Sequence, residues 1–121
     1  MAEHGEAAQV LTDLWEMIET QQWDKIPDLL DPEVQLRYVH TGELLDAESY
    51  VRTNREYPGR WHVALHDMVG DGDRAVSCTR IYDGELTFWV ASFATSRNGR
   101  IAELVEVWTE AGQQPPDRPS A

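Results

Sequence analysis

Residues 74–109, RAVSCTRIYDGELTFWVASFATSRNGRIAELVEVWT, carry the clearest indication of the fold. Three runs within this stretch, 74–82, 85–96 and 100–109, alternate apolar and polar residues as β-strands do. Asp83-Gly84 and Asn98-Gly99 separate the runs. Both dipeptides favour tight hairpin turns because they accept positive φ angles. A similar run, 60–69, precedes Gly70-Asp71-Gly72-Asp73, so we expect four strands in an antiparallel meander.

The preceding half of the chain predicts three helices and two strands. An amphipathic pattern predicts a helix over about 6–22, and a shorter helix follows from Asp24 until Asp31-Pro32 ends it. Strands are expected at 34–39 and 43–45, then a helix over 47–56 with Asp46 as its N-cap. The expected fold is α+β, with the helices packed on a strongly curved mixed or antiparallel sheet. Residues 1–111 form one domain, and the Pro-rich, polar residues 112–121 are expected to be a disordered tail.

Large apolar residues occur on both faces of the predicted sheet. In the run 85–96, Phe88 and Val90 point one way, whereas Trp89 and Phe93 point the other. The helices can cover only one face, and a second copy of the chain is the simplest cover for the other. We therefore expect a homodimer that forms through the sheet, with an exposed and moderately apolar face as the alternative.

Composition excludes several classes of function. The 121 residues carry a formal net charge of -12, which disfavours nucleic acid and anionic membrane surfaces as partners. A signal peptide and a membrane-spanning run are not apparent, so a cytoplasmic location is expected. The single cysteine, Cys78, permits no internal disulfide, and its mid-strand position predicts burial. Neither a glycine-rich phosphate loop nor metal-ligand spacing is visible, so no cofactor and no metal are expected.

Three stretches carry a family resemblance. They are WDKIPDLLDPEV at residues 23–34, GDGDRAV at 70–76, and NGRI at 98–101 followed by EVW at 106–108. In this order and spacing, they resemble the nuclear transport factor 2-like superfamily, and more closely its SnoaL-like polyketide cyclase group. The resemblance implies a cone-shaped fold with a pocket between the helices and the concave sheet face. It implies no single reaction, because members include cyclases, isomerases, dehydratases, epoxide hydrolases and non-catalytic binders.

The chain departs from two catalytic patterns of that superfamily. Ketosteroid isomerases carry a Tyr on the first helix and an Asp near the end of the first strand, whereas Leu14 and Arg37-Tyr38 stand near those positions here. Limonene epoxide hydrolases carry Arg and Asp two residues apart on a middle strand and another Asp on the last. Here Tyr82 replaces the first of these acids after Arg80, and Glu106 lies on the last strand.

Arg80 and Glu106 are the first candidate catalytic pair. Alternation places Val76, Cys78, Arg80 and Tyr82 on one face of their strand, and Leu104, Glu106 and Trp108 on one face of the last. These two strands flank the Phe88 strand about 9–10 Å apart, and the Arg80 and Glu106 side chains can span that gap as a buried ion pair on the pocket floor. Glu106 would then act on a proton or a water molecule, with Arg80 tuning its pKa or stabilising an oxyanion. The alternatives are a structural ion pair and two exposed side chains.

Two histidines are further acid–base candidates. His62 and His66 share a face of the first long strand, but four residues of strand separate them by about 13 Å, too far to bind one metal ion. Either imidazole titrates near neutrality and can act as a general acid or base. The alternative for each is a place in the core or at the rim of the sheet.

The candidate substrate-binding residues are mostly aromatic: Tyr38, His40, Tyr50, Tyr57, Tyr82, Phe88 and Trp108. Such rings suit a hydrophobic, ring-bearing ligand. The leading hypothesis is a cofactor-independent enzyme that cyclises, isomerises or dehydrates a polyketide-like or other hydrophobic ring compound. The alternatives are an epoxide-hydrolase-like enzyme that uses Arg80 and Glu106, a non-catalytic binding protein for such a compound, and a dimerisation module with a filled pocket.

Overall fold

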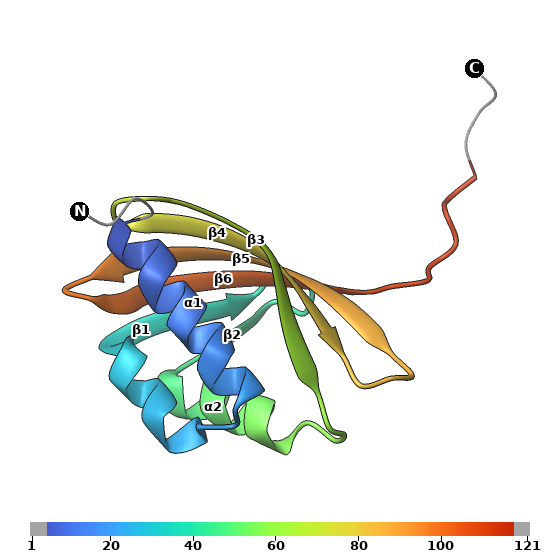
Figure 1. The fold of residues 1–121 in the computed structure, drawn as a ribbon, viewed down its shortest axis with the longest axis horizontal. Coiled ribbons are helices and arrows are strands. Elements are labelled where there is room, and N and C mark those ends of the chain that lie inside the picture. Colours follow the sequence, from blue (N-terminus) through green and yellow to red (C-terminus); the bar gives the residue numbers. More distant parts are fainter. Residues whose placement is uncertain (1–4, 118–121) are drawn as a thin grey trace.

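The computed structural model describes residues 5–117, and its helices all lie on one side of a curved sheet (Figure 1). The helices are α1 (Gly5–Glu19), the short 3₁₀ helix η1 (Trp23–Leu29) and α2 (Ala47–Glu56). The strands are β1 (Leu30–Tyr38), β2 (Glu43–Leu45), β3 (His62–Asp71), β4 (Arg74–Tyr82), β5 (Thr87–Arg97) and β6 (Arg100–Glu110). The predicted α+β fold class and the order of its elements are confirmed.

The sheet is mixed, with the strand order β2-β1-β6-β5-β4-β3. Strands β3 to β6 form the antiparallel meander, and β1 joins it parallel to β6. Asn98 and Gly99 both adopt positive φ angles, 54° and 77°, in the turn between β5 and β6. This is the conformation for which an Asn-Gly hairpin turn is selected.

Helix α1 packs its apolar side on the concave face of the sheet. Leu11, Leu14 and Trp15 are buried there. The start of the helix lies against the turn between β3 and β4, where Ala7 N donates to Gly72 O at 3.0 Å. A Cβ atom at Gly5 would lie 2.6 Å from Gly72 N, so the close approach of the two backbones requires glycine.

The segment after α1 differs from the prediction. Residues 23–29 form a 3₁₀ helix, and β1 begins at Leu30, four residues earlier than expected. Pro32 therefore lies inside a strand. Its missing N–H is tolerated because the pairing of β1 with β6 is irregular between Leu30 and Gln35. The Asp31 carboxylate accepts from Glu33 N at 2.9 Å and pairs with Arg97 at 3.2 Å, which fixes this stretch.

The other element boundaries follow the prediction closely. Helix α2 spans the expected residues, and the Asp46 side chain caps it by accepting from Ser49 N at 2.8 Å. Strand β5 begins two residues late, because Asp83 Oδ1 accepts from the backbone N–H groups of Glu85 and Leu86 and keeps them in the turn. Strand β3 contains a register shift between Leu65 and Asp67, which leaves His66 without a partner on β4.

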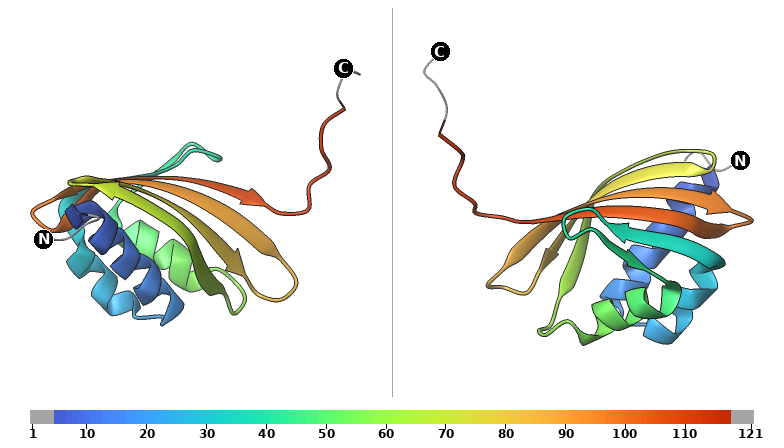
Figure 2. Two further views of the ribbon diagram at one scale, coloured as in Figure 1. Left: turned by 45° about the horizontal axis from the view of Figure 1, so that its top comes forward. Right: turned by 180° about the vertical axis from the view of Figure 1, so that it is seen from behind.

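The two faces of the sheet have different surroundings (Figure 2). The concave face carries the core and the helices. On the convex face Val69, Val76, Phe93 and Val107 are exposed, and none of the helices within residues 5–117 covers them. The free Cys78 is also exposed on this face, so the prediction that it is buried is wrong. Its neighbours in sequence, Ser77 and Thr79, take the buried face instead.

Residues 112–117 extend from β6 without regular secondary structure and are exposed. The rest of the predicted tail lies outside the described residues. Within residues 5–117, the structure contains no helix that is long and apolar enough to cross a membrane.

Candidate functional site

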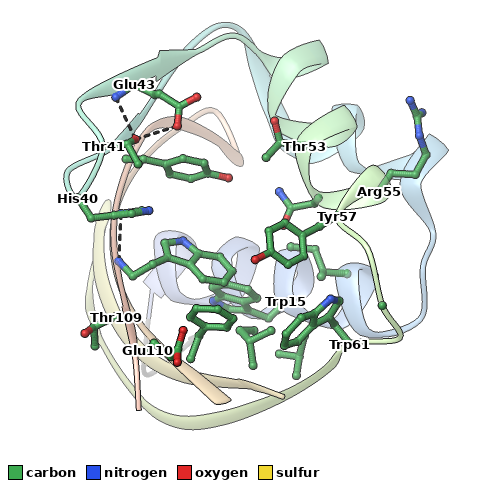
Figure 3. A pocket seen from close by; sticks show the side chains of 18 of the residues that line it. Trp15, His40, Thr41, Glu43, Thr53, Arg55, Tyr57, Trp61, Thr109 and Glu110 are labelled. Atoms are coloured by element: carbon green, nitrogen blue, oxygen red, sulfur yellow. Dashed lines mark hydrogen bonds between the residues drawn. The ribbon is translucent and has the colours of Figure 1, made fainter. Parts of the chain in front are cut away.

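A cavity of about 410 Å³ lies between the helices and one end of the concave sheet face (Figure 3). Residues from α1, η1, α2 and all six strands line it, as do residues of the connecting loops. Its volume is within the usual range for small-molecule sites. The lining residues are Trp15, Ile18, Gln21, Trp23, Tyr38, His40, Thr41, Glu43, Thr53, Asn54, Arg55, Tyr57, Gly59, Trp61, Val63, Ile81, Phe88, Trp108, Thr109 and Glu110.

Aromatic rings in mutual contact form most of the cavity wall. Centroid distances link Tyr57 to Trp61 at 5.5 Å, Trp61 to Phe88 at 5.6 Å, Phe88 to Trp108 at 6.1 Å and Trp108 to Tyr38 at 6.4 Å. These are tilted or edge-on contacts, the arrangements that aromatic pairs prefer. The continuous belt from Tyr57 to Tyr38 supplies flat apolar surfaces for a ligand.

Glu106 lies directly behind this belt and is 1% exposed. Trp108 Nε1 donates to its Oε1 at 3.1 Å, while the hydroxyl groups of Tyr50 and Ser92 each donate to its Oε2 at 3.3 Å. Burial raises the pKa of Glu106 to about 7, although the three hydrogen bonds act in the opposite direction. Near neutral pH, the protonated and ionised forms of this carboxyl group are therefore both well populated.

Glu106 and one of its donors, Ser92, belong to a polar row that crosses the buried face of the sheet. Ser77 on β4 pairs with Ser92 on β5, Ser92 pairs with Glu106 on β6, and Glu106 lies beside Tyr38 on β1. At the far end, Trp15 Nε1 donates to Ser77 Oγ at 3.3 Å. Because these groups are neutral, the row stabilises the carboxylate through dipoles alone.

The two phenols nearest to Glu106 stay protonated. Burial raises the pKa of Tyr50 well above its ordinary value, and the nearby Glu106 carboxylate raises it further. Burial and Glu106 also raise the pKa of Tyr38. Both hydroxyl groups are consequently hydrogen-bond donors rather than bases. Tyr38 lines the cavity, so its hydroxyl group can donate to a ligand.

The structure divides the sequence-predicted site residues into three groups. Five line the cavity: Tyr38, His40, Tyr57, Phe88 and Trp108. Glu106 and Tyr50 stand behind the wall and bind each other. The remaining four, Arg80, Tyr82, His62 and His66, lie elsewhere.

The predicted convergence of Arg80 with Glu106 is wrong. On β4, the residues that share the face of Glu106 are Ser77, Thr79 and Ile81, as the pairing of Ser77 with Ser92 requires. Arg80 and Tyr82 point to the convex face, where the guanidinium carbon lies 4.3 Å from the centroid of the Tyr82 ring. Strand alternation identifies two sets of residues, but only the register between strands decides which set faces the cavity.

The two histidines do not approach Glu106 either. His66 lies at the irregularity in β3 and packs against Trp89 of the convex face, with ring centroids 4.8 Å apart. The His62 ring lies 5.5 Å from that of Tyr82, and its Nδ1 is 3.4 Å from Glu19 Oε2 at the end of α1. Their predicted acid–base roles in the pocket are therefore not supported by their positions. No group of three or more potential metal ligands occurs within residues 5–117.

Sequence reasoning missed several residues of the site. Ser92 was not distinguished from other strand residues, although its place opposite Glu106 makes it a donor. Trp15 and Trp61 line the cavity, although the sequence pattern did not single them out as ligand contacts. Asn54 of α2 also lines the cavity, and its amide donates to Tyr50 O at 2.9 Å. The signal for Ser92 was present, since a hydroxyl residue within an apolar run requires a buried partner.

Comparison with known families gives one decisive match. The model of the SnoaL-like domain matches residues 11–104, which is most of the chain and includes all the residues that line the cavity except Trp108, Thr109 and Glu110. The chain belongs to the SnoaL-like family. The predicted resemblance is thereby confirmed. A comparison with curated protein sequences finds no match to this SnoaL-like protein.

Solved structures show the same fold at low sequence identity. A "putative ketosteroid isomerase" from Kribbella flavida is 22% identical with a TM-score of 0.82, covering 96% of this chain and 91% of its own. An epoxide hydrolase of M. tuberculosis, described as LEH-like, is 18% identical with a TM-score of 0.69, covering 86% and 83%. IdmH, a "putative polyketide cyclase" from Streptomyces antibioticus, is 14% identical with a TM-score of 0.73, covering 84% and 91%. At these identities, the likeness concerns the fold alone.

Proposed function

We propose that the cavity binds a hydrophobic ring compound and that Glu106 exchanges a proton with it without a cofactor. The observation that carries this proposal is a fully buried carboxyl group with a pKa of about 7, placed behind the aromatic wall of a cavity. A group whose pKa is near the working pH is the most effective general acid–base catalyst. The reaction would be an isomerisation, a cyclisation or a dehydration.

The proton transfer involves few groups. The Glu106 carboxylate takes a proton from a carbon next to a carbonyl group, and the electron pair of the broken C–H bond moves onto the carbonyl oxygen. The Tyr38 hydroxyl group, kept protonated by its raised pKa, donates to the oxygen anion that forms. Returning the proton to another carbon completes an isomerisation. Attack of the enolate on a second carbonyl completes a cyclisation once the new alkoxide takes the proton back from Glu106. In a dehydration, the enolate expels a hydroxyl group from the next carbon, and the proton on Glu106 converts it to water.

Trp108 controls contact between ligand and carboxyl group. Its ring lines the cavity, and its Nε1 donates a hydrogen bond to Glu106 Oε1 at 3.1 Å. A ligand reaches that oxygen when the indole turns aside, and the hydrogen bond to Trp108 is then exchanged for contact with the substrate. The two bonds from Tyr50 and Ser92 to Oε2 keep the carboxyl group in place meanwhile.

A non-catalytic binding protein is the second candidate, and one observation favours it. Glu106 does not line the cavity, and its carboxyl group accepts hydrogen bonds from Trp108 and Tyr50. In a binding protein, its role would be to hold these two side chains in position. The epoxide-hydrolase-like alternative is not retained, because Arg80 and Glu106 lie on opposite faces of the sheet.

Carbon-acid exchange in D₂O separates these two functions. Uptake of deuterium by a panel of cyclic ketones is followed by NMR with the wild-type protein, Glu106→Gln and Glu103→Gln. Glu103 is an exposed carboxylate on the same strand and serves as the matched control. We expect faster exchange with the wild type and Glu103→Gln, and exchange at the background rate with Glu106→Gln. Equal rates for all three proteins, with the ketones bound, would establish the binding protein instead.

We also propose that two copies pair through the convex face. Val69, Val76, Phe93 and Val107 form an exposed apolar patch there, bordered by the half-buried Val105. Contiguous exposed apolar surface of this kind marks interaction sites. A two-fold arrangement places the same patch of each copy against the other and leaves both cavities open on the opposite side.

A further inference from the structure

The charges around the cavity are predominantly negative. Glu43 and Glu110 line it, and Glu106 lies behind Trp108. None of these three carboxyl groups takes part in an ion pair within residues 5–117. Arg55 is the only arginine or lysine of this part of the chain that lines the cavity, and its Nη2 binds Glu56 Oε2 at 3.1 Å. In Figure 3, the Arg55 side chain points away from the cavity.

His40 does not supply a positive charge in this arrangement. Its ring lines the cavity, and its Nδ1 is 3.3 Å from the backbone N–H of Trp108, as the dashed line in Figure 3 shows. A backbone N–H can only donate, so Nδ1 must carry its lone pair, and the ring is the neutral tautomer with its proton on Nε2. The cavity therefore holds carboxylates without a cationic side chain to balance them.

The aromatic wall adds a second attraction for positive charge. Seven aromatic side chains besides His40 line the cavity, including four tryptophans. The faces of aromatic rings are negative, and tryptophan attracts cations most strongly. Quaternary and protonated amines are the ligands that such aromatic enclosures recognise.

We propose that the ligand of this cavity carries a protonated or quaternary amine on its hydrophobic ring system. This inference rests on the proposed binding function and gives it a substrate class. The ring system contacts the aromatic belt between Tyr57 and Tyr38, and the ammonium group lies toward Glu43 and Glu110. The net charge of -12 also favours a positively charged ligand, because it attracts cations toward the protein.

The chemistry of the wall disfavours an anionic ligand for the same reasons. A carboxylate ligand would approach Glu43 and Glu110 without a free cation to offset the repulsion, and it would face the negative side of the rings. An uncharged ligand would gain the apolar contacts, but it would gain no attraction to the carboxylates or to the negative faces of the rings. The three charge types should therefore bind in the order cation, neutral compound, anion.

Calorimetric titration with three probes of similar size tests this order. The probes are (2-naphthylmethyl)trimethylammonium, 2-naphthylacetamide and 2-naphthylacetate, each added to the full chain at pH 7 and moderate salt. We expect the ammonium to bind roughly tenfold more tightly than the amide, which is the size of a desolvated cation–π contact, and the acetate to bind most weakly. In the double variant Glu43→Gln/Glu110→Gln, the preference for the ammonium should shrink while amide binding stays unchanged.

The matched control is Glu16→Gln/Glu33→Gln, which removes two exposed carboxylates outside the cavity and changes the net charge equally. This control should keep the full preference for the ammonium. Equal affinities for ammonium and amide in the wild-type protein would overturn the amine proposal and leave the binding function intact. Binding of none of the probes would contradict the binding function itself.

Discussion

Glu106 shows how burial and hydrogen bonding compete at a single carboxyl group. Asp31 provides the contrast, since a backbone N–H from Glu33 and the nearby Arg97 hold the pKa of that carboxyl below its usual value. Glu106 has three donors and still titrates near 7, because its donors are neutral and the group is buried. Desolvation therefore dominates at Glu106, which is the condition that makes a carboxylic acid useful near neutral pH.

The raised pKa of Glu106 predicts a specific loss of stability with pH. The folded protein holds this proton up to about pH 7, whereas the unfolded chain releases it near 4.5. Stability therefore falls as pH rises through this window and is constant above it. At about 1.4 kcal/mol per pH unit, the loss amounts to about 3 kcal/mol. Urea unfolding at intervals from pH 5 to pH 8 measures it.

The comparison with Glu106→Gln isolates this group from the other 21 acidic residues. The difference in unfolding free energy between the wild type and this variant should fall by about 3 kcal/mol from pH 5 to pH 8. For Glu103→Gln, on the same strand but exposed, the difference should stay flat. A flat difference for Glu106→Gln as well would mean that the carboxyl group has an ordinary pKa.

Alternation along a strand separates its residues into two sets, but the sequence does not show which set faces the cavity. Glu106 and Trp108 were correctly assigned to one face of the last strand. For β4, however, Arg80 was assigned to the same face as Glu106, and Cys78 was expected to be buried. Both errors have one cause, since Cys78 and Arg80 belong to the same alternating set on β4. That set faces outward because Ser77, not Cys78, aligns with Ser92.

Among the elements, the contact of α1 with the turn between β3 and β4 depends most on a single residue. Gly5 has φ +78°, and a Cβ atom there would meet three backbone atoms of Gly72 at less than 3.0 Å. The substitution Gly5→Ala should lower the free energy of unfolding by at least about 2 kcal/mol, through backbone strain and the displacement of α1. Denaturant unfolding is the measurement.

Gly42 provides the matched control for this substitution. It also has φ +78°, but a Cβ atom there would meet nothing within 4 Å. Gly42→Ala should therefore show only the conformational cost of about 1 kcal/mol. Equal effects of the two substitutions would show that the contact with Gly72 does not constrain α1.

Elements fixed by local chemistry were predictable, and those fixed by distant partners were not. The bounds of α2 follow from its Asp46 cap, and the meander follows from its turn residues. The early start of β1 depends on an irregular pairing with β6 that accommodates Pro32, and these strands are some 65 residues apart in the chain. The irregularity at His66 likewise arises from pairing between strands, which local sequence does not encode.

At the scale of the whole molecule, the helices of residues 5–117 lie on one side of the sheet and leave its convex face uncovered (Figure 2). If two copies pair there, the wild-type protein should have twice the chain mass of 13.8 kDa. Phe93→Glu would place two charges in the centre of that interface and should yield monomers. Size-exclusion chromatography with light scattering distinguishes the two masses.

Leu86→Glu is the control for Phe93→Glu, because Leu86 has the same exposed fraction but lies in the turn between β4 and β5. The Leu86→Glu variant should remain dimeric. A monomeric wild-type protein at micromolar concentrations would refute pairing through the convex face and leave the cavity proposals unaffected.

A direct titration of Glu106 tests whether a carboxyl group that titrates near neutral pH stands behind the aromatic wall. The side-chain carboxyl carbon of Glu106, assigned by comparison with Glu106→Gln, is followed by carbon-13 NMR from pH 4 to pH 9. We expect a midpoint near pH 7. A midpoint near 4.5, the ordinary value for glutamate, would contradict this expectation and leave Glu106 as a structural anchor for Trp108 and Tyr50.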